Sequence, residues 1–138
     1  MKKLSLLIAV GSFVFLSIAK PTVDVSTFET YSQQMQAMAT KYIAEQKFEN
    51  ADKAIVKWLA TYNALSAKDK ETYKAVYADI MIEKAKALTQ INQHYDALVC
   101  LKTAVKNGYS NAQLLNTDAN LSALKTYSEF AKIVGSIK

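Results

Sequence analysis

The sequence predicts an all-α fold, and three observations support that prediction. From Ser26 onward, apolar side chains recur at intervals of three and four residues, as they do on one face of an amphipathic helix. Pro21 is the only proline, so the chain from Thr22 to Lys138 lacks the residue that most strongly breaks helices. Only three glycines are present, and no segment shows the strict alternation of a half-buried strand.

The first 19 residues have the composition of an export signal peptide. Lys2 and Lys3 form a positive amino-terminal region that precedes an uncharged, mostly apolar run. Ser17 and Ala19 then place small residues two positions apart, as signal peptidase requires. The run is shorter than the roughly 20 apolar residues that span a bilayer, which favours cleavage after Ala19 over an uncleaved anchor.

Cleavage would leave residues 20–138, in which residues 20–25 form a linker around Pro21 and residues 26–138 form one helical domain. Loss of the two signal lysines would lower the formal net charge from +5 to +3. The remaining lysines are spread along the chain, whereas a nucleic-acid-binding surface needs a concentrated basic stripe. We therefore expect an exported protein, periplasmic or secreted, with no nucleic acid partner and no membrane span after cleavage.

The first two helices are predicted by their apolar stripes. Ser26 and Glu29 have the spacing of a capping box that opens the first helix. Its inward residues are Phe28, Tyr31, Met35, Met38 and Tyr42. A second helix is expected after Lys47, and its inward residues are Ala51, Ile55, Trp58, Tyr62 and Leu65. Ser66 has the character of an N-cap, with Asp69 as an early acidic residue of the next helix.

The rest of the chain predicts further helices of different lengths. A long third helix is expected over residues 69–91, and a fourth helix over residues 94–106. Asn107 and Gly108 supply a C-terminal cap to the fourth helix. The polar stretch 110–120 is expected to hold only short helical turns. Finally, Thr126 and Glu129 form a second capping box, which opens the last helix.

No set of residues has the spacing of a catalytic, metal or cofactor site. Cys100 is the only cysteine, and its apolar neighbours favour a buried thiol over pairing between chains. His94 precedes Cys100 by about 600° of helical rotation, so the two side chains lie on different faces and form no dyad. Asp79 and Glu83 are followed by lysines, as on a solvated, charged helix face. The sequence predicts a protein that is not an enzyme and has no cofactor or metal.

The chain matches itself when it is shifted by 46 residues. The coinciding positions are Met35 with Met81, Ala39 with Ala85, Tyr42 with Leu88, Ala51 with Ala97, Ile55 with Leu101, and Trp58 with Ala104. Both copies place a small residue between larger ones. Two antiparallel helices approach closely only where one of them presents such a small side chain, so the repeat predicts two similar helix pairs.

This order of residues resembles the helix-turn-helix unit of tetratricopeptide repeats, most closely in the stretch Tyr42-x5-Phe48-x2-Ala51. The tail resembles the segment that often closes such repeat groups in bacterial proteins, through Ala104, Gly108, Tyr109, Leu115, Asp118, Leu121, Leu124 and Phe130. The resemblance departs from the family spacing of roughly 34 residues, and two units are fewer than the roughly three that a solenoid usually needs. It implies antiparallel helix pairs stacked as a short tetratricopeptide-like solenoid with C-terminal capping helices; a helical bundle with the same periodicity is the alternative.

In tetratricopeptide proteins, the first helix of each pair lines a concave groove that receives a peptide or a partner helix. The resemblance implies that the exposed side of those helices here carries Gln33, Gln36, Thr40, Ile43, Asp79, Ile82, Lys86 and Gln90. Only Lys86 is basic among them, so the carboxylate clamp of chaperone-binding members is not supported. A merely solvated face is the alternative interpretation of these residues.

The expected function is that of a non-catalytic, protein- or peptide-binding scaffold that acts outside the cytoplasm through a helical groove. One alternative is a structural or self-associating helical protein, because a short solenoid leaves its end faces incompletely covered. A second alternative is a carrier of a small apolar ligand between the helices.

Overall fold

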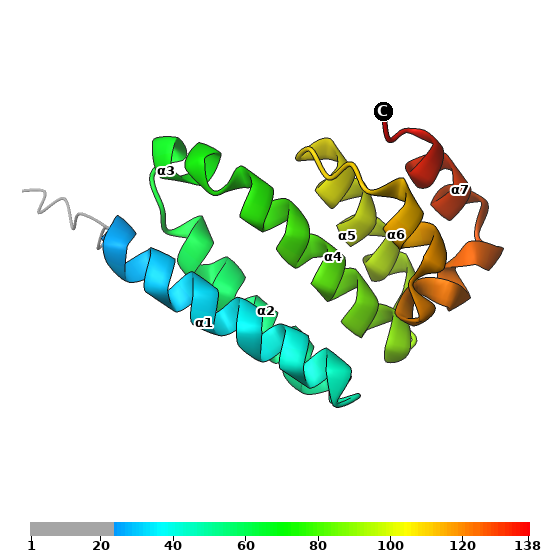
Figure 1. Ribbon diagram of the computed structural model, residues 1–138, viewed down its shortest axis with the longest axis horizontal. Helices are drawn as coiled ribbons and strands as arrows, with labels where there is room; N and C mark the ends of the chain where they lie inside the picture. The colour runs from blue at the N-terminus through cyan, green and yellow to red at the C-terminus, as the bar shows by residue number, and fades with distance from the viewer. Residues whose placement is uncertain (1–23) are drawn as a thin grey trace, which may run out of the picture.

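A computed structural model describes residues 24–138, so the predicted signal peptide and most of the predicted linker lie outside the described residues. Within this range the secondary structure is entirely helical (Figure 1). The elements are α1 (Val25–Ala44), α2 (Phe48–Asn63), α3 (Ala67–Thr72), α4 (Lys74–Gln90), α5 (His94–Lys106), α6 (Ala112–Thr117), the 3-10 helix η1 (Ala119–Thr126) and α7 (Ser128–Gly135). The all-α prediction is confirmed for the described part of the chain.

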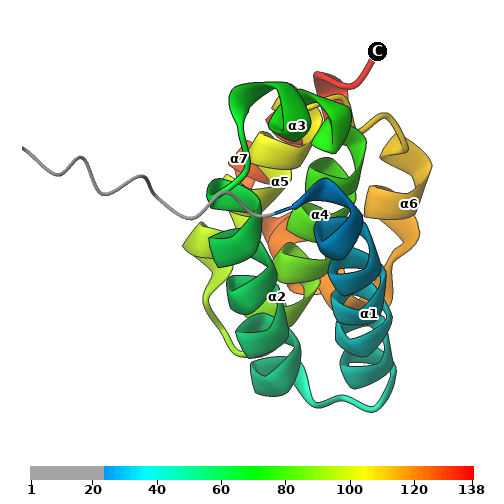
Figure 2. The same ribbon diagram turned by 90° about the vertical axis from the view of Figure 1, so that its left-hand side faces the viewer.

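The helices are arranged as two hairpins and an irregular C-terminal segment. In Figure 1, α1 and α2 lie on the left, α4 and α5 follow, and α6 and α7 lie on the right. Figure 2 shows α1 and α2 lying side by side in front of the other helices. Helix α4 packs against α1, α2, α5 and η1, so it is the central element of the fold.

The turns that close the two hairpins have the same backbone conformation. Gln46 and Asn92 are 46 residues apart, and both have positive φ, at 58° and 63°. In each turn the amide after this residue donates to a carbonyl five residues earlier: Lys47 N to Tyr42 O at 2.7 Å, and Gln93 N to Leu88 O at 2.8 Å. These are the bonds of a Schellman motif, which ends α-helices at a left-handed residue. The internal repeat seen in the sequence therefore corresponds to two similar helix–turn–helix units.

The small residues of the repeat are completely buried in the helix pairs. Ala39, Ala51, Ala85 and Ala97 each have 0 % of their surface exposed. Helix α1 packs against α2, and α4 packs against α5. The prediction that alanine is needed at the helix crossings agrees with this complete burial.

We expect Ala51→Leu and Ala97→Leu each to lower the free energy of unfolding by about 1–3 kcal/mol, because a larger side chain overfills a closely packed site. Urea unfolding monitored by circular dichroism measures this change. Ala60→Leu is the matched control, because Ala60 is exposed on α2. Parent-like stability of both buried variants would show that the two hairpins are not packed as described.

The long third helix predicted over residues 69–91 is wrong in one respect, because the structure divides it at Tyr73. Tyr73 has φ −97° and ψ 15°, which ends α3 before α4 begins. Its ring contacts that of Phe28 edge to face, with centroids 4.8 Å apart. The Tyr62 hydroxyl also donates to the Lys70 carbonyl at 3.1 Å. Because of the break, the Phe28 ring of α1 and the Tyr62 hydroxyl of α2 hold this corner of the chain. Periodicity within one helix does not reveal such contacts.

The helix caps agree with the sequence only in part. Ser66 accepts a hydrogen bond from the Asp69 amide, and α5 ends before Gly108, whose φ is 100°, so these two predicted caps are confirmed. The Ser26 capping box is wrong, because α1 begins at Val25 and the Ser26 hydroxyl donates to Asp24. The Thr126 capping box is also wrong, because Tyr127 occupies the N-cap position of α7. Both boxes fail by one or two residues at a helix start, where sequence patterns define boundaries least well.

Candidate partner-binding surface

The predicted groove residues on α1 are divided between exposed and bonded positions. Gln33 and Thr40 are exposed. Gln36 is half-buried, and its Nε2 donates to the Ser32 hydroxyl at 3.0 Å. The same hydroxyl accepts a 2.8 Å hydrogen bond from the buried Trp58 indole. Gln36 is therefore part of a network that reaches the core.

The prediction that Ile43 and Ile82 lie on an exposed side is wrong, because they are only 9 % and 2 % exposed. Ile43 belongs to a small apolar cluster with Ala51 and Ala87. Ile82 belongs to the main core, together with Leu121 and other side chains of the C-terminal segment. Both isoleucines contribute to packing and are not available to a partner.

On α4, the chain's own C-terminal segment occupies much of the predicted groove. Asp79 is exposed, but Lys86 lies 2.9 Å from Glu83 and 3.0 Å from Asp118. Burial alone would lower the pKa of Lys86, but its hydrogen bonds and charge attraction to these two carboxylates outweigh burial and raise that pKa. Gln90 Nε2 donates to the Asn120 carbonyl at 2.9 Å. The eight predicted residues thus do not form one open groove.

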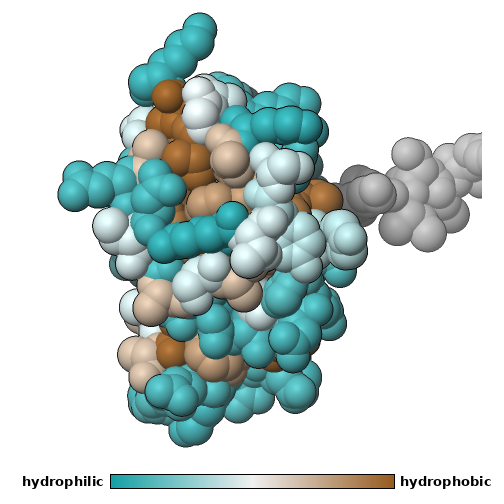
Figure 3. All heavy atoms as spheres, turned by 90° about the vertical axis from the view of Figure 1, so that its right-hand side faces the viewer, coloured by the Kyte–Doolittle hydropathy of each residue, from teal (hydrophilic) through white to brown (hydrophobic). Residues whose placement is uncertain are grey.

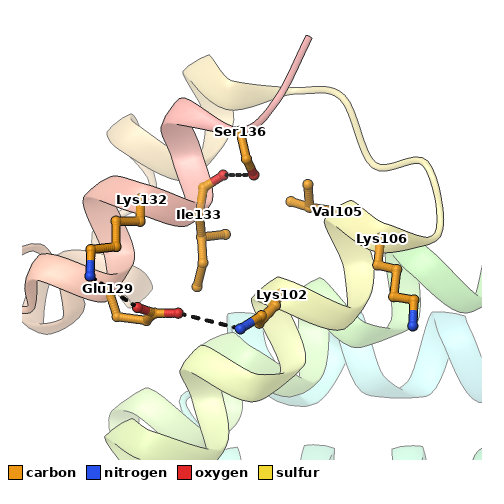
Figure 4. Close-up of a pocket in the computed structure, with 7 residues that line it drawn as sticks. All are labelled: Lys102, Val105, Lys106, Glu129, Lys132, Ile133 and Ser136. Atoms are coloured by element: carbon orange, nitrogen blue, oxygen red, sulfur yellow. Dashed lines mark hydrogen bonds and ion pairs between the residues drawn. The ribbon is translucent and has the colours of Figure 1, made fainter.

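A cleft lies instead between α5 and α7 (Figure 4). One half of it encloses about 400 Å³ and is lined by Lys102, Val105, Lys106, Glu129, Lys132, Ile133 and Ser136. Figure 4 shows Val105 and Ile133 between the two helices, with charged side chains around them. Ser136 caps this end of α7, because its hydroxyl donates to the Ile133 carbonyl at 2.6 Å.

The other half of the cleft adjoins the first, because Lys102 and Glu129 line both. It encloses about 390 Å³, and its remaining lining residues are Tyr95, Leu98, Val99, Tyr127 and Ser128. Tyr95 is 77 % exposed and Val99 is 63 % exposed, the two highest values among the exposed large apolar side chains. We call the two halves together the α5–α7 cleft.

The sequence of α5 explains why these side chains share a surface. Tyr95, Val99, Lys102 and Lys106 are separated by four, three and four residues, so they lie on one face of the helix. The opposite face carries the fully buried Ala97, Leu101 and Ala104. Apolar periodicity predicted only the buried stripe of α5, although the exposed stripe has a signal of its own in two apolar residues followed by two lysines at this spacing.

Tyr127 is held in the cleft by its contacts with α5. Its hydroxyl lies 3.0 Å from Nδ1 of His94, and the two rings are nearly perpendicular at 79°. The Tyr95 ring also meets it edge to face, with centroids 5.8 Å apart. Among the described residues, His94 Nε2 is the one buried side-chain polar atom without a hydrogen-bond partner. These contacts fix the aromatic end of the cleft.

One ion pair, between Lys102 of α5 and Glu129 of α7, crosses the middle of the cleft, and Glu129 also pairs with Lys132 on its own helix. Glu129 lies 3.6 Å from Lys102 and 3.9 Å from Lys132. The two lysine side chains are 73 % and 74 % exposed. Exposed pairs of this kind contribute only about 0–1 kcal/mol to stability, so the lysines can exchange Glu129 for another carboxylate at little cost.

Cys100 lies on α5 but lines neither half of the cleft. Cys100 is buried, as predicted, and burial raises the pKa of its thiol to about 11. It therefore stays protonated at neutral pH, whereas a nucleophile must be a thiolate. Within residues 24–138, no group of His, Cys, Asp and Glu side chains could hold a metal ion. None of the helices in that range is long and apolar enough to cross a membrane.

The α5–α7 cleft thus combines exposed apolar side chains with exposed charged side chains at a concave surface. No family model matches the chain, and no curated protein or solved structure matches it either.

Proposed function

We propose that the protein is a non-catalytic binding module that acts outside the cytoplasm and holds a segment of another protein in the α5–α7 cleft. The observation that carries this proposal is the exposure of Tyr95 and Val99 along the wall of an apolar cleft. Aromatic side chains in such positions are common anchors of protein interfaces. Complete burial of one such apolar side chain is worth about 1.5–3 kcal/mol, which gives a partner a reason to bind there.

Two further observations support the proposed class of protein. The signal peptide pattern of residues 1–19 supports action outside the cytoplasm. The matching turns at Gln46 and Asn92 support a tetratricopeptide-like scaffold with a non-standard repeat length. Because the C-terminal segment already covers part of α4, we assign partner binding to the α5–α7 cleft and not to the face lined by the first helix of each pair.

Self-association by end-to-end stacking of helix pairs is the competing proposal. Figure 3 shows the end of the molecule opposite to α1: brown apolar atoms gather in its upper half, and teal and white atoms separate them from smaller apolar areas below. Stacking repeats bury a continuous apolar face. The mixed character of this end favours a different partner over a second copy stacked upon it.

Val99→Asp should reduce the recovery of a specific partner about tenfold or more, because it places a negative charge among the apolar side chains of this half of the cleft. The measurement is affinity capture with residues 20–138 from extract of the producing cells, followed by quantitative mass spectrometry. Val56→Asp is a matched control, since Val56 is a 49 % exposed valine on α2 and does not line the cleft. The free energies of unfolding of both variants should lie within about 0.5 kcal/mol of that of the parent, because substitutions of exposed residues rarely cost more.

A partner that is lost with Val99→Asp and retained with Val56→Asp supports the proposal. Equal recovery by all three proteins contradicts it. If the chain captures only itself, sedimentation velocity of the same variants decides whether the cleft mediates that contact, and a dimer in place of a partner overturns the proposal.

A further inference from the structure

We infer that the segment held in the α5–α7 cleft is acidic and amphipathic, with apolar side chains that enter the cleft and carboxylates that meet its lysines. This inference rests on the proposed function, since it names the chemistry of the partner. It depends on the contrast between the floor of the cleft and its rim.

The floor of each half of the cleft is apolar, and the Lys102–Glu129 ion pair lies between the two halves. Leu98 and Tyr127 form it in one half, and Val105 and Ile133 form it in the other. The cleft follows α5 from Tyr95 to Lys106, which corresponds to about 16 Å at the rise of an α-helix. A segment of about three helical turns, or about five extended residues, matches that length.

The rim of the cleft has an excess of positive charge. Lys102, Lys106 and Lys132 line it, and Glu129 is its only acidic residue. Glu129 is already shared between Lys102 and Lys132. Among the ion pairs of the described residues, none involves Lys106. Figure 4 likewise draws no interaction from Lys106 to the other lining residues. Carboxylates on an incoming segment would therefore meet lysines whose charge is not fully balanced.

The same charges argue against a second copy in this cleft. A symmetric dimer brings the same patch of both chains together, so two surfaces that each carry three lysines and one glutamate would face one another. Facing like charges disfavours such an interface. Residues 20–138 are also basic, with a formal net charge of +3, so attraction at long range would favour an acidic partner.

The positive rim would also attract an anionic membrane surface, but the shape of the cleft suits a membrane less well than a protein segment. The buried lining residues Leu98 and Ile133 are recessed between the two helices, and Glu129 lies where both halves of the cleft meet. A bilayer surface cannot enter such a recess, whereas a single side chain can. We therefore assign the cleft to a protein segment and make membrane binding an outcome of the test.

The first experiment is selection of a displayed library of random 16-residue peptides on the protein with residues 20–138. We expect the enriched peptides to combine Leu, Ile or Phe with an excess of Asp and Glu. Val99→Asp should abolish their binding, and Val56→Asp should leave it unchanged.

The second experiment reverses the charge of the rim. The double variant Lys106→Glu with Lys132→Glu should weaken the enriched peptides about tenfold or more, and selection on it should enrich basic peptides instead. The matched control is Lys53→Glu with Lys57→Glu, which makes the same change in net charge with two exposed lysines of α2. Raising the salt concentration should weaken binding to the parent and to this control alike.

The outcomes separate the inference from the function on which it rests. Enriched peptides that depend on Val99 but are neutral or basic overturn the inference and leave the proposed function standing. No enrichment that depends on Val99 overturns both. Val99-dependent sedimentation with vesicles of phosphatidylcholine and phosphatidylglycerol, without peptide enrichment, assigns the cleft to membranes and also overturns the inference.

Discussion

Replacing Trp58 with alanine should lower the free energy of unfolding by about 3–5 kcal/mol, a large part of the 5–15 kcal/mol by which such domains are usually stable. Trp58 is completely buried. Its ring stacks on Tyr62 at a centroid distance of 5.1 Å and an interplanar angle of 13°. The variant leaves a large cavity, and it also removes the indole that donates to the Ser32 hydroxyl.

Circular dichroism in urea is the appropriate measurement, because Trp58 is the only tryptophan and its fluorescence is lost in the variant. Tyr95→Ala is the control: it removes another large aromatic side chain, but one that is 77 % exposed, and should cost only about 0.5–1.5 kcal/mol, from the loss of its edge-to-face contact with Tyr127. A loss below about 1 kcal/mol for Trp58→Ala would mean that the aromatic cluster does not hold α1, α2 and α4 together.

Leu121→Ala should cost about 2–5 kcal/mol, although it lies in the irregular part of the chain. Leu121 is on η1, is completely buried and belongs to the main apolar core. Leu114→Ala is the matched control, since Leu114 is 38 % exposed on the neighbouring helix α6. Urea unfolding of both variants measures the difference. Similar stabilities for the two would indicate that the C-terminal segment is an appendage and not part of the core.

The sequence predicted the hairpins well because each follows one repeating rule. Apolar spacing located α1, α2 and α5, and the shift of 46 residues predicted the correspondence of the two turns. The buried alanines and the buried Cys100 also followed from local pattern, since small and apolar residues on an inward face are rarely exposed. These features depend on contacts within one helix pair.

The prediction failed where one helix contacts several others. Helix α4 packs against α1, α2, α5 and η1, so it buries Ile82 on the side that a two-helix unit would expose. The position of η1 depends on long-range packing, which periodicity within a helix does not encode. The α5–α7 cleft was missed for the same reason, since α7 lies more than twenty residues after α5 in the sequence.

The contacts of Lys86 with Asp118 and of Gln90 with Asn120 have a consequence for competition between ligands. A segment tethered to its binding surface by the same chain acts at a local concentration in the millimolar range or above. A free peptide of ordinary affinity would have to displace that segment. The displacement would also expose Leu121, which is completely buried in the folded protein. The C-terminal segment therefore outcompetes free peptides for this face of α4. We expect free peptides at ordinary concentrations not to bind there.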